Sequence, residues 1–386
     1  MHKNTLFHNL LQEIPRHKFG KIVKRHQGDR YVKHFTCFRL LLTLLYAQIR
    51  GAKSFREIVF GLMPKLNKLY HIGLEPVKRS TLSDALLVRD CRIFEEMFYE
   101  LYSQCQDVTP KHKFRFKNPL YSMDSTTIDL CLSVFDWAKF RKKKGAIKIH
   151  FSLDHGGMIP NFLVVTEGKR HDVTVAKNDF PVIPDSISVF DRAYLDYNHL
   201  YYIHKEKGFF VTRIKKNTDY IITGQHEITL KGGVLGDYEI EMKGFYTSQK
   251  YPEKLRLVRY YDAETGKIYE FLTNNFRLSA KTIADIYKER WQIELFFKWI
   301  KQNLKIKTFL GTSKNAVMIQ IWVAMIYYLL LAYIKHQTKY SGSYLELHRL
   351  FKEALFDAIT VIDLLNLTLK DIPRIRSPAI QQMPLF

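Results

Sequence analysis

One predicted helix carries side chains suited to chemistry on a phosphate group: a carboxylate that can bind a metal ion, and cations that can hold phosphate oxygens. Residues 283–304 (IADIYKERWQIELFFKWIKQNL) contain no Pro or Gly. At about 100° per residue, one stripe about 80° wide holds an acid, three cations and a tyrosine. These residues are Tyr287, Arg290, Glu294, Lys298 and Lys301. A solvated face with pairs such as Glu294–Lys298 explains the charges, but it does not explain why one carboxylate stands among so many cations.

The spacing of these residues matches a known signature. Tyr287-x2-Arg290-x3-Glu294-x6-Lys301 resembles the Y-R-E-K signature of the bacterial DDE transposases of insertion-sequence family four. Four residue types at three fixed gaps make this a specific signal. The resemblance implies that Glu294 is the third catalytic carboxylate of such an enzyme.

Upstream segments extend the resemblance over nearly the whole chain. LYSMDSTTIDL is similar to the family's first-aspartate strand, and VFDRAYLDY is similar to its second-aspartate motif. The resemblance therefore assigns catalytic and metal-binding roles to Asp124 and Asp191. The N-terminal FHNLLQEIPRHKF and the following FTCFRLLLTLLYAQIRGAKSFREI resemble a helical domain found before the catalytic core in one subgroup. The family usually has Gly where this chain has Ala193, and Ala would cost ~1 kcal/mol if that position needs positive φ.

Three carboxylates suit a metal-dependent reaction. Two divalent cations ~3.5–4 Å apart serve hydrolysis of a phosphodiester and its rejoining by in-line displacement. Carboxylate oxygens favour Mg²⁺, with Mn²⁺ as a substitute, so we expect two ions per active site. Other carboxylates compete for this role. Asp129 lies five residues beyond Asp124 and faces the opposite side of a regular strand, and Asp196 is expected to cap the next helix.

The remaining polar residues are assigned to DNA. We expect the cations to hold phosphates beside the scissile bond while the tyrosine donates a hydrogen bond. Family members cut through a DNA hairpin, which requires a base to be flipped out and stacked. Trp291 is the candidate for that stacking, and a packing role suits it equally. The predicted DNA contacts are Tyr287, Arg290, Trp291, Lys298, Lys301, Arg141, Lys142, Lys143 and Lys144. The last four form a basic run, for which a solvated loop is the simpler explanation.

The elements that position these residues change character near residue 120. Strands are expected at 121–132, 146–153, 158–166, 186–190 and 209–214, with short helices between the later ones. This pattern predicts an α/β fold, and the resemblance makes it a ribonuclease-H-like mixed sheet with a β-rich insertion before the last catalytic helix. An all-α N-terminal domain precedes it. The predicted domains are a helical DNA-binding domain (1–110), a catalytic core (111–217 and 276–340), a β insertion (218–275) and a C-terminal helical segment and tail (341–386).

Within the N-terminal segment, a capping box at Ser54 to Glu57 opens an amphipathic stretch, and a second helix is expected after residue 79. These helices fit either a helix-turn-helix or a small bundle that only packs.

Composition narrows the class of protein. Lys and Arg number 60 against 38 Asp and Glu, giving a net charge of +22 that favours a polyanionic partner. The four cysteines show no zinc-finger or disulfide pattern, and the N-terminus lacks a signal peptide, so a reducing cytoplasm is expected. The resemblance implies a bacterial cytoplasm, with the protein associated with the nucleoid. Residues 317–334 just reach the length of a membrane span, but we interpret them as a core helix.

We therefore predict a cut-and-paste transposase that binds terminal inverted repeats and target DNA, with no membrane partner. The resemblance adds a homodimer in which one subunit binds an end and the other cuts it. The alternatives are a ribonuclease-H-fold nuclease without strand transfer and a catalytically degenerate DNA-binding regulator.

Overall fold

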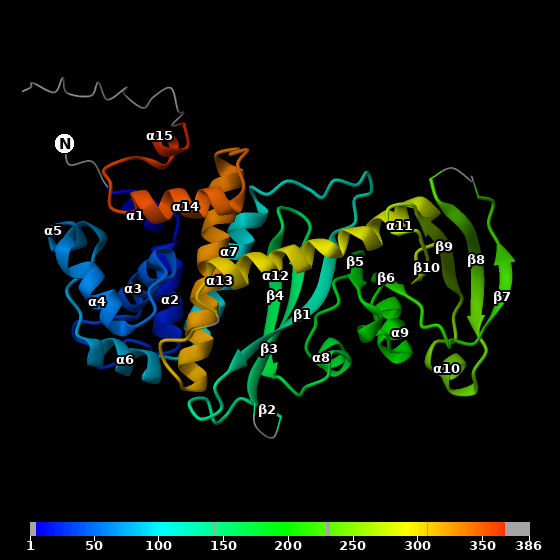
Figure 1. Cartoon of the computed structure of the whole chain (residues 1–386), viewed down its shortest axis with the longest axis horizontal. Coiled ribbons are helices and arrows are strands. Elements are labelled where there is room, and N and C mark those ends of the chain that lie inside the picture. Colours follow the sequence, from blue (N-terminus) through cyan, green and yellow to red (C-terminus); the bar gives the residue numbers. More distant parts are fainter. Residues whose placement is uncertain (1–4, 142–143, 229–231, 307, 367–386) are drawn as a thin grey trace, which may run out of the picture.

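The computed structural model describes residues 5–141, 144–228, 232–306 and 308–366. In Figure 1 the N-terminal helices lie at one end of an elongated molecule, and a sheet extends from the middle to the other end. The candidate catalytic residues lie on the middle part of this sheet and on helix α12 (Trp291–Asn303), which crosses it.

The ten strands found in the described residues belong to one sheet, in the order β2-β3-β1-β5-β6-β10-β9-β8-β7, with β4 paired to β3. Their bounds are β1 (Leu120–Leu130), β2 (Lys139–Arg141), β3 (Lys144–Asp154), β4 (Ile159–Glu167), β5 (Ile187–Phe190), β6 (Phe209–Arg213), β7 (Tyr220–Gln225), β8 (Val234–Met242), β9 (Leu255–Asp262) and β10 (Lys267–Thr273). β1, β5 and β6 run parallel, whereas β3 is antiparallel to both β1 and β4. The order β4-β3-β1-β5-β6 with these directions confirms the predicted ribonuclease-H-like mixed sheet.

The segment predicted as a β insertion forms the four antiparallel strands β7 to β10. These strands continue the central sheet, because β10 pairs with β6. The insertion is therefore joined to the central strands by backbone hydrogen bonds. The exact domain boundaries remain predictions.

Helices cover both faces of the sheet. Successive residues of a strand point to opposite faces, and in β5 Val189 packs in the cluster beneath α11 (Ala280–Glu289), whereas Phe190 packs with α8 (Asp172–Asn178) and α9 (Tyr197–Lys205). The short α10 (Phe245–Lys250) lies against α9 and β8. The central strands are therefore buried on both faces.

The helical end is built around α13 (Lys314–Gln337). This helix packs against α3, α6, α7, α14 and β4. Among the residues that the structure describes, it is the one helix long and apolar enough to cross a bilayer, but 89% of its most apolar window is buried inside the protein. The surrounding helices are α1 (Leu6–Gln12), α2 (Arg16–Arg25), α3 (Cys37–Arg50), α4 (Phe55–Leu62), α5 (Leu66–Leu69), α6 (Arg79–Val88), α7 (Arg92–Gln106), α14 (Tyr344–Ala354) and α15 (Val361–Leu365). One apolar core is thus shared by the N-terminal helices and α13.

The N-terminal helices form a bundle. Ser54 caps α4 by accepting a hydrogen bond from the Glu57 amide, as predicted. The Glu57 carboxylate accepts from the Lys53 amide and not from the Ser54 amide, so the predicted capping box is only half formed. However, two 3₁₀ turns, η1 (Met63–Lys65) and η2 (Tyr70–Ile72), and α5 lie between α4 and α6. The short turn of a helix-turn-helix is therefore not present between these two helices.

Candidate active site

Strand pairing brings the first two predicted carboxylates together. Asp124 lies in β1, and Asp191 follows directly after β5. Met123 of β1 is in register with Phe190 of the parallel strand β5, so the next residue of each chain segment is one of the two aspartates. Asp124 and Asp191 are therefore neighbours across the sheet.

The third carboxylate comes from a helix that the sequence predicted to be continuous. It is broken into α11 and α12 at Arg290. The Arg290 amide bonds to the Tyr287 carbonyl at 3.1 Å, and the Ile293 amide bonds to the Arg290 carbonyl at 3.2 Å. Both are tight i→i+3 bonds, which replace the regular i→i+4 bonds of an α-helix at this point. The prediction of one unbroken helix was therefore wrong, although Glu294 still reaches the site.

Arg290 links two of the carboxylates. Its guanidinium donates to Asp124 Oδ2 at 3.2 Å and to Glu294 Oε1 at 2.6 Å. The side chains of Arg290, Asp124 and Glu294 are only 15%, 22% and 34% exposed. Partly buried charge pairs of this kind are screened less than surface pairs, so Arg290 holds β1 and α12 in a fixed relation.

The site carries excess negative charge. Burial raises the pKa of Asp124 to about 6, and Glu294 and Asp191 add to that rise, while the Ser125 amide and Arg290 oppose it. Burial and the nearby Asp191 also raise the pKa of Tyr287, so its hydroxyl stays protonated and can donate a hydrogen bond. Three carboxylates with one partly compensating guanidinium form a site that an added cation would stabilise.

The donor set suits a hard divalent ion in its chemistry. All three candidate ligands supply carboxylate oxygens, the preferred donors for Mg²⁺. Within the described residues, however, no three acidic, His or Cys side chains lie close enough to surround one ion. Arg290 stands between Asp124 and Glu294, so closing the carboxylates around an ion requires this guanidinium to shift. Asp124, Asp191 and Glu294 are the candidate ligands for such an ion.

An aromatic cavity of about 220 Å³ lies beside the carboxylates. It is lined by Asp191, Arg213, Tyr260, Asp262, Tyr269, Phe271, Ala284, Tyr287, Lys288, Arg290 and Trp291. Tyr287 packs against Phe271 at 4.8 Å between ring centroids, and Trp291 is 55% exposed at the edge. The cavity thus joins β6, the insertion strands β9 and β10, and both parts of the broken helix.

The sequence analysis did not identify Arg213 as part of this site. Arg213 ends β6, stacks over the Tyr269 ring at 4.7 Å and lines the same cavity as Tyr287. No spacing rule marks it, because its place depends on β10 pairing with β6. Asp172 of α8 accepts a hydrogen bond from Ser125 at 2.7 Å, on the face of β1 opposite to Asp124.

Among the described residues, the other predicted DNA contacts lie outside the aromatic cavity. Lys298 is exposed on α12, and Lys301 lies about two turns beyond Glu294 on the same helix. Arg141 and Lys144 lie in the strands β2 and β3, and Lys142 and Lys143 lie outside the described residues.

Three predictions about neighbouring positions are resolved. Asp196 caps α9 by accepting from the His199 amide at 3.1 Å, as expected. Asp129 is exposed and lies away from the carboxylates linked by Arg290. Ala193 lies in the 3₁₀ turn η3 (Arg192–Tyr194) and does not have positive φ, so the predicted strain from replacing Gly is not present.

Sequence comparison agrees with this fold and site. Residues 115–330 match the family model "Transposase DDE domain", and residues 2–75 match a domain of unknown function, DUF4372. The chain therefore belongs to the DDE transposase family and is an enzyme of that class.

Two relatives and one solved structure illustrate the family. The "Probable transposase for insertion sequence element IS5377" of Geobacillus stearothermophilus is 30% identical over 88% of this chain and 87% of its own length. A protein of Sinorhizobium fredii named as transposase y4zB is 34% identical over 67% of this chain and 71% of its own length. A piggyBac transposase synaptic complex with hairpin DNA covers 97% of this chain and 81% of its own, with a TM-score of 0.43 and 12% identity.

Proposed function

We propose that this transposase binds the terminal inverted repeats of an insertion sequence, cleaves them through a hairpin intermediate and joins them to target DNA. Asp124, Asp191 and Glu294 are the proposed catalytic residues and metal ligands. The observation that supports this most directly is their convergence from β1, the end of β5 and α12, with Arg290 bonded to two of them.

The proposed metal complement is two Mg²⁺ ions per active site, with Mn²⁺ as a substitute. Bound divalent ions supply charge stabilisation at the attacking and leaving oxygens. The protein's own part is to bring the carboxylates together and to orient the DNA. Arg290 suits the second task, because a guanidinium that pairs with carboxylates also pairs well with a phosphodiester. Tyr287 keeps its proton and donates a hydrogen bond, and Lys298 and Lys301 extend the cationic stripe along α12.

The aromatic cavity is the proposed site for a base flipped out of the DNA hairpin. Its rings and the edge position of Trp291 suit stacking, which is worth ~1–3 kcal/mol per base. A second cavity, of about 450 Å³, is also lined by Asp191, together with Arg192, Lys215 and Lys216. Cations lining both cavities next to a catalytic carboxylate suit a path for the sugar-phosphate backbone.

The N-terminal helices are proposed to bind the transposon ends, and two subunits are proposed to act together, one holding an end while the other cuts it. The cytoplasmic location and the absence of a membrane partner also remain predictions.

The test is cleavage of a labelled transposon end in Mg²⁺ or Mn²⁺ by Glu294→Gln. The substitution keeps the side chain's shape but removes its charge, so end binding should be retained and cleavage should fall by orders of magnitude. Glu289→Gln is the matched control, because Glu289 lies on α11 and pairs with Lys113 away from the carboxylates. Cleavage at the wild-type rate by Glu294→Gln would show that the three-carboxylate assignment is wrong.

The same preparations separate the alternative functions. With a pre-cleaved transposon end, a transposase gives a joined product, whereas a plain nuclease gives none. A degenerate DNA-binding regulator would bind the end but show no Mg²⁺-dependent cleavage.

A further inference from the structure

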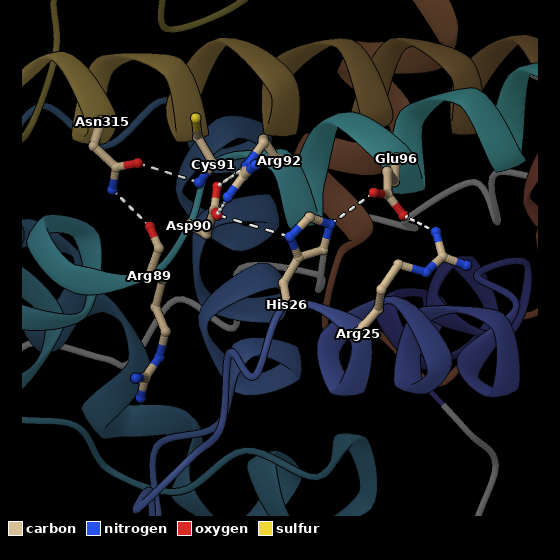
Figure 2. Close-up of polar contacts among 8 residues, drawn as sticks. All are labelled: Arg25, His26, Arg89, Asp90, Cys91, Arg92, Glu96 and Asn315. Carbon is tan, nitrogen blue, oxygen red and sulfur yellow. Dashed lines mark hydrogen bonds and ion pairs between the residues drawn. The ribbon is translucent and has the colours of Figure 1, made fainter.

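Helix α2 divides its basic residues between two faces. One face meets α7: Lys18 bonds to Glu100 at 2.7 Å, and Arg25 bonds to Glu96 at 2.6 Å. His26, just after α2, also contacts Glu96 at 2.6 Å. Figure 2 shows Arg25 and His26 reaching Glu96 from below. The charges on this face are matched by acids, which is typical of a structural contact.

The contact fixes α2 relative to the catalytic part of the chain. His26 lies 3.7 Å from Asp90, in the loop before α7 (Figure 2). Asn315, at the start of α13, holds that loop by donating to the Arg89 carbonyl at 2.6 Å and accepting from the Cys91 amide at 3.1 Å. Because α13 also packs against β4, anything bound to α2 is held at a defined distance from the sheet.

The other face of α2 lines a groove of about 710 Å³. Phe19 and Val23 of α2 and Phe38 of α3 contribute apolar walls. Four cations also line the groove: Arg16, Lys24, Arg30 and Arg39. We call this feature the α2–α3 groove.

The cations of the groove are mostly not matched by acids. Arg39 pairs with Glu75, but no ion pair joins Arg16, Lys24 or Arg30 to any carboxylate in the described part of the chain. Arg16 lies over the Phe38 ring at 4.6 Å. Asp29, the acid that lines the groove, accepts from the Cys37 amide and so serves the start of α3. Arg30 donates to the Gln27 side chain and the Tyr31 hydroxyl, which are neutral groups. Positive charge is therefore concentrated at a concave surface and mostly not neutralised by acids.

A strained aromatic residue extends beside the groove. Tyr31 has φ of 61° and is 88% exposed. A bulky residue in the left-handed region is an outlier, and burial in the core does not compensate for this one. The Arg30 guanidinium lies over the Tyr31 ring at 4.9 Å. An exposed ring backed by a cation suits stacking on a nucleobase or sugar.

We propose that the α2–α3 groove binds the sugar-phosphate backbone of double-stranded DNA, with Arg16, Lys24 and Arg30 contacting phosphates and Tyr31 contacting the adjacent nucleotide. This proposal rests on the proposed function of the N-terminal helices and names the surface that performs it. An anionic membrane fits less well, because membrane-binding surfaces present an apolar face outward, whereas the apolar residues here line a hollow.

Deletion of residues 1–110 is a poor test, because these helices share a core with α13. Point variants of the full chain are better. Lys24→Ala combined with Arg30→Ala removes two proposed phosphate contacts, and Lys18→Ala is the matched control on the opposite face of α2. Tyr31→Asn removes the ring but keeps a residue that tolerates positive φ. Circular dichroism checks that each variant is folded.

Binding is measured by fluorescence anisotropy on a labelled duplex that carries the terminal repeat, over a range of salt concentrations. The double variant should weaken binding ~10–100-fold and reduce the salt slope by about 2, since each phosphate contact contributes about 0.9. Tyr31→Asn should weaken binding about fivefold or more without changing the slope. Lys18→Ala should match the wild type.

Wild-type affinity and slope in the double variant would overturn the proposal. It would also be overturned if the double variant lost binding to vesicles of anionic phospholipid while DNA binding was unchanged. Failure of the catalytic proposal can be distinguished from failure of the groove proposal, because the catalytic proposal is tested by DNA cleavage with Glu294→Gln. That variant retains the groove and should bind the duplex with wild-type affinity.

Discussion

A buried ion pair in the extended sheet gives a sharp prediction about stability. Arg256 of β9 donates to both carboxylate oxygens of Asp237 on β8, at 2.8 and 2.6 Å. It also donates to the carbonyls of Asn275 and Leu278, at 2.9 and 2.6 Å. The two charged side chains are only 5% and 4% exposed. Arg256 therefore fixes the loop that leads from β10 into α11.

The magnitude follows from what Arg256→Met leaves behind. An uncompensated buried carboxylate costs ~3–5 kcal/mol, and each carbonyl that loses its partner costs up to ~1–3 kcal/mol. With about 1–3 kcal/mol for the two carbonyls together, we expect Arg256→Met to lose about 4–8 kcal/mol. Asp237→Leu combined with Arg256→Met should be more stable than Arg256→Met alone, losing only about 1–3 kcal/mol, because the lone charge is gone and two carbonyls remain unpaired.

Urea unfolding measures the free energy of unfolding of the wild type and each variant. Hydrogen exchange of peptides from β8 to α11 shows whether the loss of stability is located there. Lys254→Met is the matched control: Lys254 pairs with Glu239 on the same two chain segments but is 54% exposed, so the loss should stay within ~1 kcal/mol. The reasoning is refuted if Arg256→Met behaves like this control, or if the double variant is less stable than Arg256→Met alone.

Three further predictions concern single positions. Ala193→Gly should not stabilise the protein, because Ala193 lacks positive φ; a rise in melting temperature would contradict this. Asp196→Ala should cost about 1 kcal/mol in urea unfolding, since the His199 amide loses its cap, and an unchanged midpoint would argue against the cap. Burial lowers the pKa of His155 from 6.5 to about 4, so the unfolded chain binds more protons between these values. The contribution of His155 to stability should therefore be constant above pH 6.5 and decline by up to ~3 kcal/mol as the pH falls toward 4. Unfolding of His155→Asn across this range should show a smaller decline than the wild type, and an equal decline would exclude His155 as a source.

Local sequence patterns determined much of this protein. Runs of apolar and β-forming residues placed the core strands within one or two residues of their observed bounds, because such side chains suit a sheet that is buried on both faces. Short polar residues at helix starts marked Ser54 and Asp196 as caps, since capping depends on atoms within three residues. Residue types at fixed gaps identified the stripe of Tyr287, Arg290 and Glu294, because residues three or four positions apart lie on the same face of a helix.

Only the tertiary structure decided how those parts meet. The break at Arg290 accompanies bonds to Asp124 and Glu294, and the first of these residues is 166 positions away in the chain. Arg213 joined the site because β10 pairs with β6, and the α2–α3 groove became a candidate surface because α7 neutralises only one face of α2. The break at Arg290, the position of Arg213 and the α2–α3 groove all depend on contacts between distant segments. The free energy of those contacts depends on burial and on neighbouring charges, which cannot be read from a local sequence pattern.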